Sequence, residues 1–378
     1  MCFSISCSSK KQGKSINDLF TVTDTLEIPI DENISAIGNY YNYFDDSNYA
    51  KNILVIPSLK NELYFFDIDK KTLKKKIKLE EEGPNGVGAI LKVNVIDEQY
   101  IFVNSTRSLE NYLVDTNGIK KKTFSMKGNK ELDSRGIIVM PRTNLIHYNQ
   151  NIIVYPDINL LTDGMTGRSY YKLDDKVFAS LDMKTSEYSM LPIQFPLQMR
   201  NKEGFWNTFH FTPSYDFMND NLYYSFPGCD SLYSYDLNKK KIQRISAQSI
   251  HEVNKSNIIT KQIRTTKELY STYAANCSYF KVLTDKYNNN IYRIIGHPTE
   301  KWKDSGNIND VAVSKPCSIQ VFDSKLNFLG ETKIFEQNSY DFLDSFVGKK
   351  GIYISNNHPQ NTKSNEENLS YTIFTLKK

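Results

Sequence analysis

The residues of this sequence that are best suited to recognise a ligand are arginines, aromatic residues and histidines in its longest loops. The candidate site comprises Arg168, Tyr170, Arg200, Trp206, His210, His297 and Trp302. Arginine and tryptophan are enriched in the hot spots of binding interfaces, and aromatic rings provide platforms for sugars or peptides. Each of these residues, taken singly, also fits a rim salt bridge or a packed ring, so the indication of a binding surface rests on their gathering on one face.

Motifs for catalysis and for metal or phosphate binding are incomplete in this chain. The five histidines include no pair at metal-ligand spacing and no His-Glu-x-x-His motif, and no Gly-x-Ser-x-Gly turn occurs. Gly13-Lys14-Ser15 ends like a phosphate-binding loop, but Ser8 stands where the first glycine belongs. The glycine-rich segment 83–88 leads into a predicted strand, so we interpret it as a tight turn. We assign no catalytic residue, cofactor or metal from the sequence.

A repeated pair of strands must position the loops. Each unit is a short aromatic or aliphatic run, a loop, and a second run. The second run ends on aspartate in all but the last unit. The pairs are 52–58 with 62–67, 99–104 with 111–115, 151–155 with 177–182, 221–226 with 231–236, 290–295 with 317–323, and 351–355 with 369–376. Two-strand units that recur within one chain indicate a radially repeated all-β fold.

Each pair is extended by a strand on either side. The preceding strands are 36–44, 86–96, 136–148, 205–218, 278–287 and 340–348, and the following strands are 73–79, 119–126, 187–191, 241–245 and 327–334. The last unit lacks its fourth strand, whereas residues 19–30 form a strand that no unit uses. We therefore predict an all-β fold over residues 19–378, a six-bladed β-propeller of four-stranded antiparallel blades whose ring is closed by the N-terminal strand.

The lengths of the connections distinguish the two faces of the predicted disc. The turns that join the first strand to the second and the third strand to the fourth lie on one face and are short. The aspartate that recurs in the turns between the third and fourth strands fits a local turn role. The long segments are 156–176, 194–204, 247–276, 296–316 and 356–368, all of which belong to the opposite face. Long loops on a rigid scaffold carry function, so we expect ligand binding on this long-loop face. Within one loop, apolar spacing predicts a helix over 260–274 that packs against the rim.

Composition argues against several classes of protein. The 47 basic and 43 acidic residues leave a formal charge of +4, which is too weak to indicate a nucleic-acid partner. No stretch approaches the roughly 18 apolar residues that span a bilayer. The five cysteines form no paired framework, and Cys277 and Cys317 lie in predicted strands as small buried residues. We expect a monomer.

The N-terminal segment 1–18 differs from the rest of the chain. The run Phe3-Ser4-Ile5-Ser6-Cys7 precedes a polar run from Ser8 to Ser15. A small residue before a cysteine, followed by a hydrophilic tether, resembles the end of a bacterial lipoprotein signal with Cys7 as the lipidated residue. The residues before Cys7 are too few for a complete signal peptide, so this interpretation requires a start further upstream. The alternative is a disordered tail with a free thiol.

The blade pattern, the tether after Cys7 and the closing strand together resemble one family, Bacteroidetes lipoproteins that carry a domain of unknown function within the TolB-like group of six-bladed propellers. The markers are the segment 61–67 followed by 83–88, and the segment 7–11. The resemblance covers nearly the whole chain beyond about Leu19. It implies a propeller fold and a location in the bacterial cell envelope, lipid-anchored at the outer membrane or the periplasmic face, and it supplies no catalytic residues.

Two main classes of function follow. The first is a membrane-tethered binding module that holds a protein, peptide or glycan on its long-loop face. The alternative is a propeller hydrolase or lactonase-like enzyme with an axial carboxylate or metal site, because six-bladed propellers also host such enzymes. The carboxylates that an axial site would use are Asp216, Asp285, Asp341 and Asp344, most of which do not occupy matching positions. The sequence favours binding over catalysis, with a purely structural envelope protein as a third option.

Overall fold

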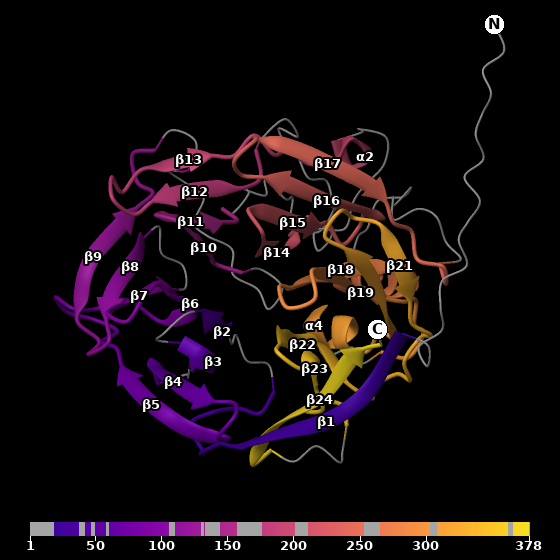
Figure 1. Ribbon diagram of the computed structural model, residues 1–378, viewed down its shortest axis with the longest axis horizontal. Helices are drawn as coiled ribbons and strands as arrows, with labels where there is room; N and C mark the ends of the chain where they lie inside the picture. The colour runs from indigo at the N-terminus through magenta and orange to yellow at the C-terminus, as the bar shows by residue number, and fades with distance from the viewer. Residues whose placement is uncertain are drawn as a thin grey trace, which may run out of the picture.

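The structure is a computed structural model. It describes residues 19–37, 42–46, 50–57, 60–105, 110–129, 132, 144–156, 176–200, 211–252, 265–302, 308–361 and 366–377. Six four-stranded sheets are arranged around a central axis (Figure 1). Neighbouring strands within each sheet are antiparallel, so the predicted all-β, six-bladed propeller is confirmed.

The strands of each blade follow one another from the axis to the rim (Figure 1). Blade I contains β2 (Asn42–Asp46), β3 (Ala50–Pro57), β4 (Glu62–Asp67) and β5 (Thr72–Lys78), and blade II contains β6 (Ile90–Val95), β7 (Tyr100–Ser105), β8 (Glu110–Asp115) and β9 (Lys120–Ser125). Blade III contains β10 (Ile146–Tyr148), β11 (Asn151–Val154), β12 (Ala179–Asp182) and β13 (Tyr188–Met190), and blade IV contains β14 (Ser214–Met218), β15 (Asn221–Ser225), β16 (Ser231–Asp236) and β17 (Lys241–Ser246). Blade V contains β18 (Ser278–Asp285), β19 (Asn290–Gly296), β20 (Cys317–Asp323) and β21 (Phe328–Glu331), and blade VI contains β22 (Asp341–Gly348), β23 (Gly351–Ser355), β24 (Asn368–Leu376) and β1 (Phe20–Pro29).

Burial decreases from the middle of a blade to its rim, and the sequence follows this gradient. Every residue of β19 is buried, whereas most residues of the rim strands β5 and β17 are exposed. A middle strand is covered by a neighbouring blade on each face, which favours continuous aromatic and β-branched runs. A rim strand meets solvent, which favours the lysines found there. Cys277 and Cys317 are free and buried, as predicted.

The strand β1 closes the ring as the outermost strand of blade VI, as the sequence predicted. It pairs with β24 along its whole length (Figure 1). Phe20 at its start packs against Tyr292 of blade V, with ring centroids 5.9 Å apart. Leu26 and Ile28 near its end pack in a core with β3 and β4 of blade I. One strand therefore joins three consecutive blades.

A buried arginine fastens blade V to blade IV. Arg293 of β19 is fully buried, and its guanidinium lies 3.9 Å from the ring centroid of Tyr279. Its Nη1 and Nη2 atoms donate to backbone carbonyls of blade IV, among them Asp230 at 2.7 Å and Cys229 at 2.9 Å. Five donors in a rigid plane suit such a set of carbonyls, which a lysine would not satisfy.

The recurrent aspartate is a turn residue, as the sequence predicted. In the turns between third and fourth strands, the carboxylates of Asp67, Asp115, Asp182, Asp236 and Asp323 accept hydrogen bonds from backbone amides two to four residues further along. These bonds replace the backbone partners that a tight turn leaves unsatisfied.

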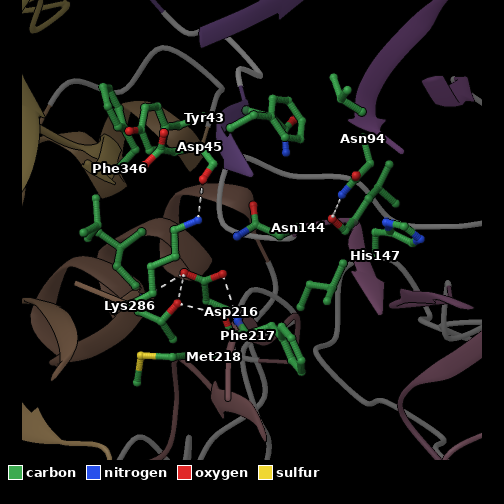
Figure 2. A pocket seen from close by; sticks show the side chains of 18 of the residues that line it. Tyr43, Asp45, Asn94, Asn144, His147, Asp216, Phe217, Met218, Lys286 and Phe346 are labelled. Carbon is green, nitrogen blue, oxygen red and sulfur yellow. Dashed lines mark hydrogen bonds between the residues drawn. The ribbon is translucent and has the colours of Figure 1, made fainter. Parts of the chain in front are cut away.

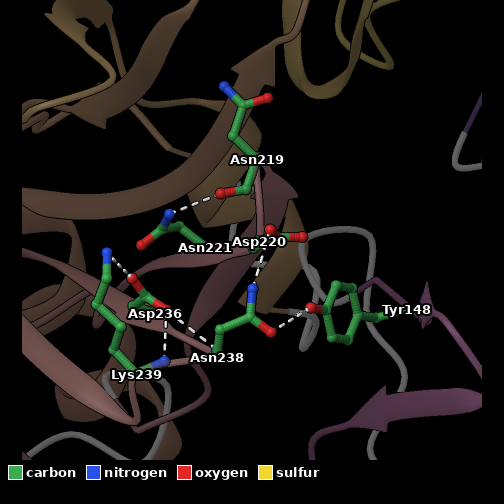
Figure 3. A network of polar contacts seen from close by, with 7 residues as sticks. All are labelled: Tyr148, Asn219, Asp220, Asn221, Asp236, Asn238 and Lys239. Carbon is green, nitrogen blue, oxygen red and sulfur yellow. Dashed lines mark hydrogen bonds and ion pairs between the residues drawn. The ribbon is translucent and has the colours of Figure 1, made fainter.

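The turn of blade IV also contacts blade III. The hydroxyl of Tyr148 donates to Asn238 Oδ1 at 3.0 Å, and Asn238 Nδ2 donates to Asp220 Oδ2 at 3.0 Å (Figure 3). The backbone amide of Asn238 also donates to Asp236 Oδ1 at 3.0 Å, which fixes the asparagine in the turn. The turn that caps a blade thus also sets its spacing from the preceding blade.

The structure contains short helices in the loops, among them α2 (Leu197–Arg200), α3 (Thr266–Ala275) and α4 (Ile308–Val313). The sequence predicted a helix over 260–274, but α3 begins at Thr266. The reason is a capping box, in which the Thr265 hydroxyl accepts from the Glu268 amide and the Glu268 carboxylate accepts from the Thr265 amide, each at 3.2 Å. Tyr270 and Tyr273 of α3 pack against Val311 of α4.

The closing strand offers a direct test of the fold. Ile28→Ala should lower the free energy of unfolding by about 2–5 kcal/mol, because Ile28 is fully buried between blades VI and I. Val22 lies on the same strand but is 60% exposed, so Val22→Ala should stay within about 0.5 kcal/mol of wild type. Urea unfolding followed by circular dichroism measures both. Equal stability of the two variants would contradict closure by β1.

Candidate functional site

A cavity of about 640 Å³ lies on the propeller axis. Its wall is formed by the inner strands of all six blades and by the residues beside them. Figure 2 shows Tyr43, Asp45 and Phe346 on one side of it and Asn94 and His147 on another. The lining continues to the residues at the short turns, so the cavity reaches the short-turn face of the disc.

Each blade contributes a polar side chain to the wall. From blade I to blade VI these are Asn42, Asn94, Asn144, Asp216, Lys281 and Asp344. Asn42, Asn94, Lys281 and Asp344 are at most 9% exposed. Polar groups at this depth must be hydrogen-bonded, or they cost free energy.

Two lysines near the axis are held by neutral acceptors. Lys281 Nζ donates to the backbone carbonyls of Leu343 and of Ser345, the latter at 2.8 Å. Lys92 lies behind the wall and donates to Asn144 Oδ1 at 3.0 Å. Burial lowers the pKa of Lys281 to about 8. Burial, with the Lys281 ammonium as second cause, lowers the pKa of Lys92 to about 7.

Of the four predicted axial carboxylates, Asp216 and Asp344 line the cavity. Asp216 Oδ2 accepts from the amide and the hydroxyl of Thr284 at 2.8 and 3.0 Å. Burial raises the pKa of Asp216, and burial followed by the neighbouring Asp341 carboxylate raises the pKa of Asp344 well above 3.8. Asp285 and Asp341 do not line the cavity. Their carboxylates accept from the backbone amides of nearby residues in the chain.

Two oxygens of the wall have no hydrogen-bond partner. They are Oδ1 of Asp344 and Oδ1 of Asn42, and both are buried. They come from the inner strands β22 and β2, which contact each other in adjacent blades. A buried acceptor without a partner costs about 1–3 kcal/mol, so a hydrogen-bond donor that reached either oxygen would lower the free energy of this part of the wall.

The rim of the cavity joins three blades. The carboxylate of Asp45 accepts from the Tyr287 hydroxyl and pairs with Lys349 Nζ at 3.4 Å. Lys286 Nζ donates to the Asp45 carbonyl at 2.8 Å (Figure 2). These contacts tie blades V and VI to blade I beside the opening, which fixes the shape of the mouth.

Of the residues predicted from the sequence as a site, the structure describes Arg200, His297 and Trp302, and these three do not line the cavity. Arg168, Tyr170, Trp206 and His210 fall outside the described residues, as does Cys7. Arg200 ends α2, and its Nη1 donates to Gln194 Oε1 at 3.4 Å.

Two further predicted residues lie in blade V and its loops. His297 is 2% exposed, and its ring lies between Ser318 Oγ at 2.8 Å and Cys277 Sγ at 3.9 Å. Burial lowers the pKa of His297 to about 3, so the ring is neutral in the interior. Trp302 is half-buried and packs edge-on against Tyr270 of α3, with centroids 6.3 Å apart. The structure therefore does not bring His297 to the surface, and it places Trp302 beside α3.

Sequence reasoning missed most of the polar ring around the axis. A local signal exists in blade II, where Lys92 and Asn94 interrupt the apolar run Leu91–Val95 of a strand that the fold must bury. Lys281 in β18 is a similar interruption. A charged or amide residue inside a predicted innermost strand is thus the pattern that indicates an axial site.

Metal-ligating side chains do not gather in the parts of the chain that the structure describes: no three His, Cys, Asp or Glu residues there could hold an ion together. Over the same ranges, no helix is long and apolar enough to cross a membrane.

Comparison with known proteins identifies relatives of the same fold. The sequence model of a family described as a domain of unknown function (DUF4221) matches residues 17–333. A crystal structure of a DUF4221 family member from Bacteroides vulgatus is 23% identical, with a TM-score of 0.80 over 96% of this chain and 99% of that one. A structure from Bacteroides fragilis, described as a "putative exported protein", is 13% identical, with a TM-score of 0.57 over 98% of each chain. No curated protein matches the chain significantly.

The buried lysines predict an unusual pH dependence of stability. Between its folded pKa of about 7 and its ordinary value of 10.5, Lys92 binds more protons in the unfolded chain than in the folded one. Stability should therefore rise with pH in this window. Lys92→Met should raise the free energy of unfolding at pH 7 by about 1–4 kcal/mol, as seen when apolar residues replace buried ionic groups, and should weaken the rise between pH 7 and pH 9.

Urea unfolding at both pH values measures this effect. The control is Lys74→Met on the exposed strand β5, which should stay within about 0.5 kcal/mol of wild type at either pH. A Lys92→Met protein less stable than wild type at pH 7 would show that the buried amine stabilises the fold.

Proposed function

The chain belongs to the DUF4221 family, as its blade motifs and closing strand indicated, and on this premise we propose that it is a ligand-binding module of the cell envelope. The ligand is held in the axial cavity and enters from the short-turn face. The observation that carries this proposal is the ring of polar side chains, one from each blade, around a cavity of about 640 Å³.

The dimensions and chemistry of the cavity support binding. Small-molecule sites typically measure about 300–1,000 Å³ and combine apolar walls with a few convergent polar groups. Here Tyr43, Phe217 and Phe346 contribute aromatic surface beside the polar ring. Titratable groups with shifted pKa values concentrate at functional sites, and Lys281 and Asp344 are such groups. An apolar axis would be the more stable design, so retention of these groups favours a role in recognition.

The alternative of an axial hydrolase or lactonase receives less support. A glycosidase needs two carboxyl groups on opposite sides of the scissile bond, and a metal-dependent enzyme needs converging ligands. Four aspartates line the cavity, Asp45, Asp97, Asp216 and Asp344. Two of them are already engaged, Asp45 by Tyr287 and Lys349 and Asp216 by Thr284. We therefore propose binding rather than catalysis.

A second candidate is recognition of a protein, peptide or glycan on the long-loop face, with Arg168, Trp206 and Trp302 as anchors. One observation favours it: the half-buried Trp302 packs edge-on against Tyr270 in a small apolar cluster between α3 and α4. Partly exposed tryptophans supported by a rigid cluster are frequent hot spots of interfaces.

We propose further that the protein is exported and lipid-anchored at Cys7. Support comes from the lipoprotein-like run Phe3–Cys7, from the polar tether after it, and from the description of the Bacteroides fragilis structure as a "putative exported protein". Two acyl chains, at about 0.8 kcal/mol per buried methylene, provide the stable attachment that a single chain does not.

Native mass spectrometry of the protein purified from its own host tests the binding site. Wild type should carry a noncovalent small-molecule adduct. His147→Trp should lose it, because a half-buried imidazole of the cavity wall is replaced by a larger indole. Val22→Trp adds the same ring on the exposed outermost strand and should keep the adduct.

A Trp302→Ala variant analysed in parallel separates the two candidates. Loss of the bound species in Trp302→Ala but not in His147→Trp would transfer the site to the long-loop face. Wild-type protein without any adduct would argue against the axial site.

The anchoring prediction is tested by detergent partitioning after expression from the native locus. Wild-type protein should enter the detergent phase, and Cys7→Ser protein should remain in the aqueous phase because it lacks the acyl chains. If the Cys7→Ser protein is recovered in the same membrane fraction as wild type, Cys7 is not the anchor.

A further inference from the structure

We propose that the ligand of the axial cavity carries a protonated amino group, which is seated between Asp344 and Asn42. This inference deepens the proposed function and rests on it.

The first argument is the pair of unpartnered acceptors. Asp344 and Asn42 line the cavity, and the Oδ1 atom of each is buried beneath its surface and accepts no hydrogen bond. The carboxylates of Asp45 and Asp216, by contrast, are engaged by hydroxyl and amide donors. A primary ammonium brings three N–H donors and no acceptor, so a single ammonium has enough donors for both oxygens.

The second argument concerns the cations of the wall. Four aspartates and two lysines line the cavity. Both lysines already donate to backbone carbonyls, Lys281 to Leu343 and Ser345 and Lys286 to Asp45. An anionic ligand would have to compete with these carbonyls, whereas a cation meets a surplus of acidic groups.

The third argument is the aromatic surface beside the two oxygens. Tyr43 and Phe346 belong to the same strands as Asn42 and Asp344, line the cavity and stack with centroids 5.0 Å apart. Because Phe346 also stacks on Tyr353, with centroids 4.7 Å apart, its faces are covered by other rings. The pair therefore offers apolar surface for the carrier chain of the amine. The strands β2 and β22 thus supply both the polar and the apolar part of the amine site.

The surroundings of Asp344 disfavour its charged form. Burial and the adjacent Asp341 raise the pKa of Asp344, against the opposing influence of Lys281 and a hydrogen bond from Ser355. A bound ammonium would favour the ionised carboxylate and offset the repulsion from Asp341. A positive charge placed beside Asp344 would therefore add to the effect of Lys281 and favour the carboxylate.

A matched set of probes tests the charge of the ligand: 2-phenylethylamine, 2-phenylethanol and phenylacetate, measured by titration calorimetry on the full chain. Wild type should bind the amine saturably and at least tenfold more tightly than phenylacetate. Asp344→Asn should weaken amine binding at least tenfold and leave 2-phenylethanol binding within about twofold, because only a charge is removed.

Two further variants guard the interpretation. Asn42→Asp adds a carboxylate on the facing strand and should tighten amine binding, which supplies a gain of function if Asp344→Asn folds poorly. Asp310→Asn is the control, since Asp310 lies in α4, does not line the cavity and should leave amine affinity unchanged when its charge is removed.

The outcomes distinguish this inference from the proposed function. Tighter binding of phenylacetate, lost in Lys281→Met, would overturn the amine site while leaving an axial binding site in place. Failure of wild type to bind the amine would also overturn it, whereas the axial site itself stands or falls with the adduct removed by His147→Trp.

Discussion

The pairing of β1 with β24 is the constraint on which the rest of the structure depends. A blade has two apolar faces, and a gap in the ring would leave one of them exposed on each of the two blades beside the gap. Because β1 belongs to blade VI but packs on blades V and I, it converts a linear array of sheets into a closed disc. Only a closed disc holds six inner strands at a fixed distance from a common axis, and only then does the axial cavity have a defined shape.

Contacts between blades carry this constraint inward. Arg293 fastens blade V to blade IV through backbone carbonyls, and Asp216 of blade IV accepts from Thr284 of blade V nearer the axis. At the rim of the cavity, Asp45 holds Tyr287 and Lys349. Contacts from the second strands to the rim of the cavity thus hold the inner strands, and the polar groups on them, in fixed positions around the axis.

The polar axis costs stability that the remaining core must offset. Buried Lys92 and Lys281 have lowered pKa values and buried Asp344 has a raised one, which means that the fold disfavours the charged form of each. The large aromatic cores between blades provide the compensation. Lys281 and Asp344 line the cavity, and titratable groups with shifted pKa values concentrate at functional sites, which supports the proposed binding site.

The architecture could be predicted from the sequence because its signals are local. The aspartates of the turns, the alternation of the strands and the unassigned strand at 19–30 all report short-range chemistry, and the structure confirms them. The axial ring could not be predicted in this way. Asn42 and Asp344 are 302 positions apart in the chain, and their shared environment arises only when β2 and β22 meet across the closure.

The loop residues illustrate the same limit. The length of the loops indicated a functional face, but neither His297 nor Trp302 proved to be a freely exposed side chain. His297 is enclosed because Ser318 and Cys277 satisfy its ring, and Trp302 packs on α3, whose position depends on a capping box at Thr265. Exposure is set by such tertiary contacts, which residue type alone does not encode.

The most direct test of the account is a high-resolution crystal structure of the protein purified from its native host without added ligands. The account predicts non-protein density in the axial cavity, with a nitrogen about 2.7–3.1 Å from both Asp344 Oδ1 and Asn42 Oδ1. A cavity that contains only ordered water, with these two oxygens bonded to water or to each other's strands, would contradict it.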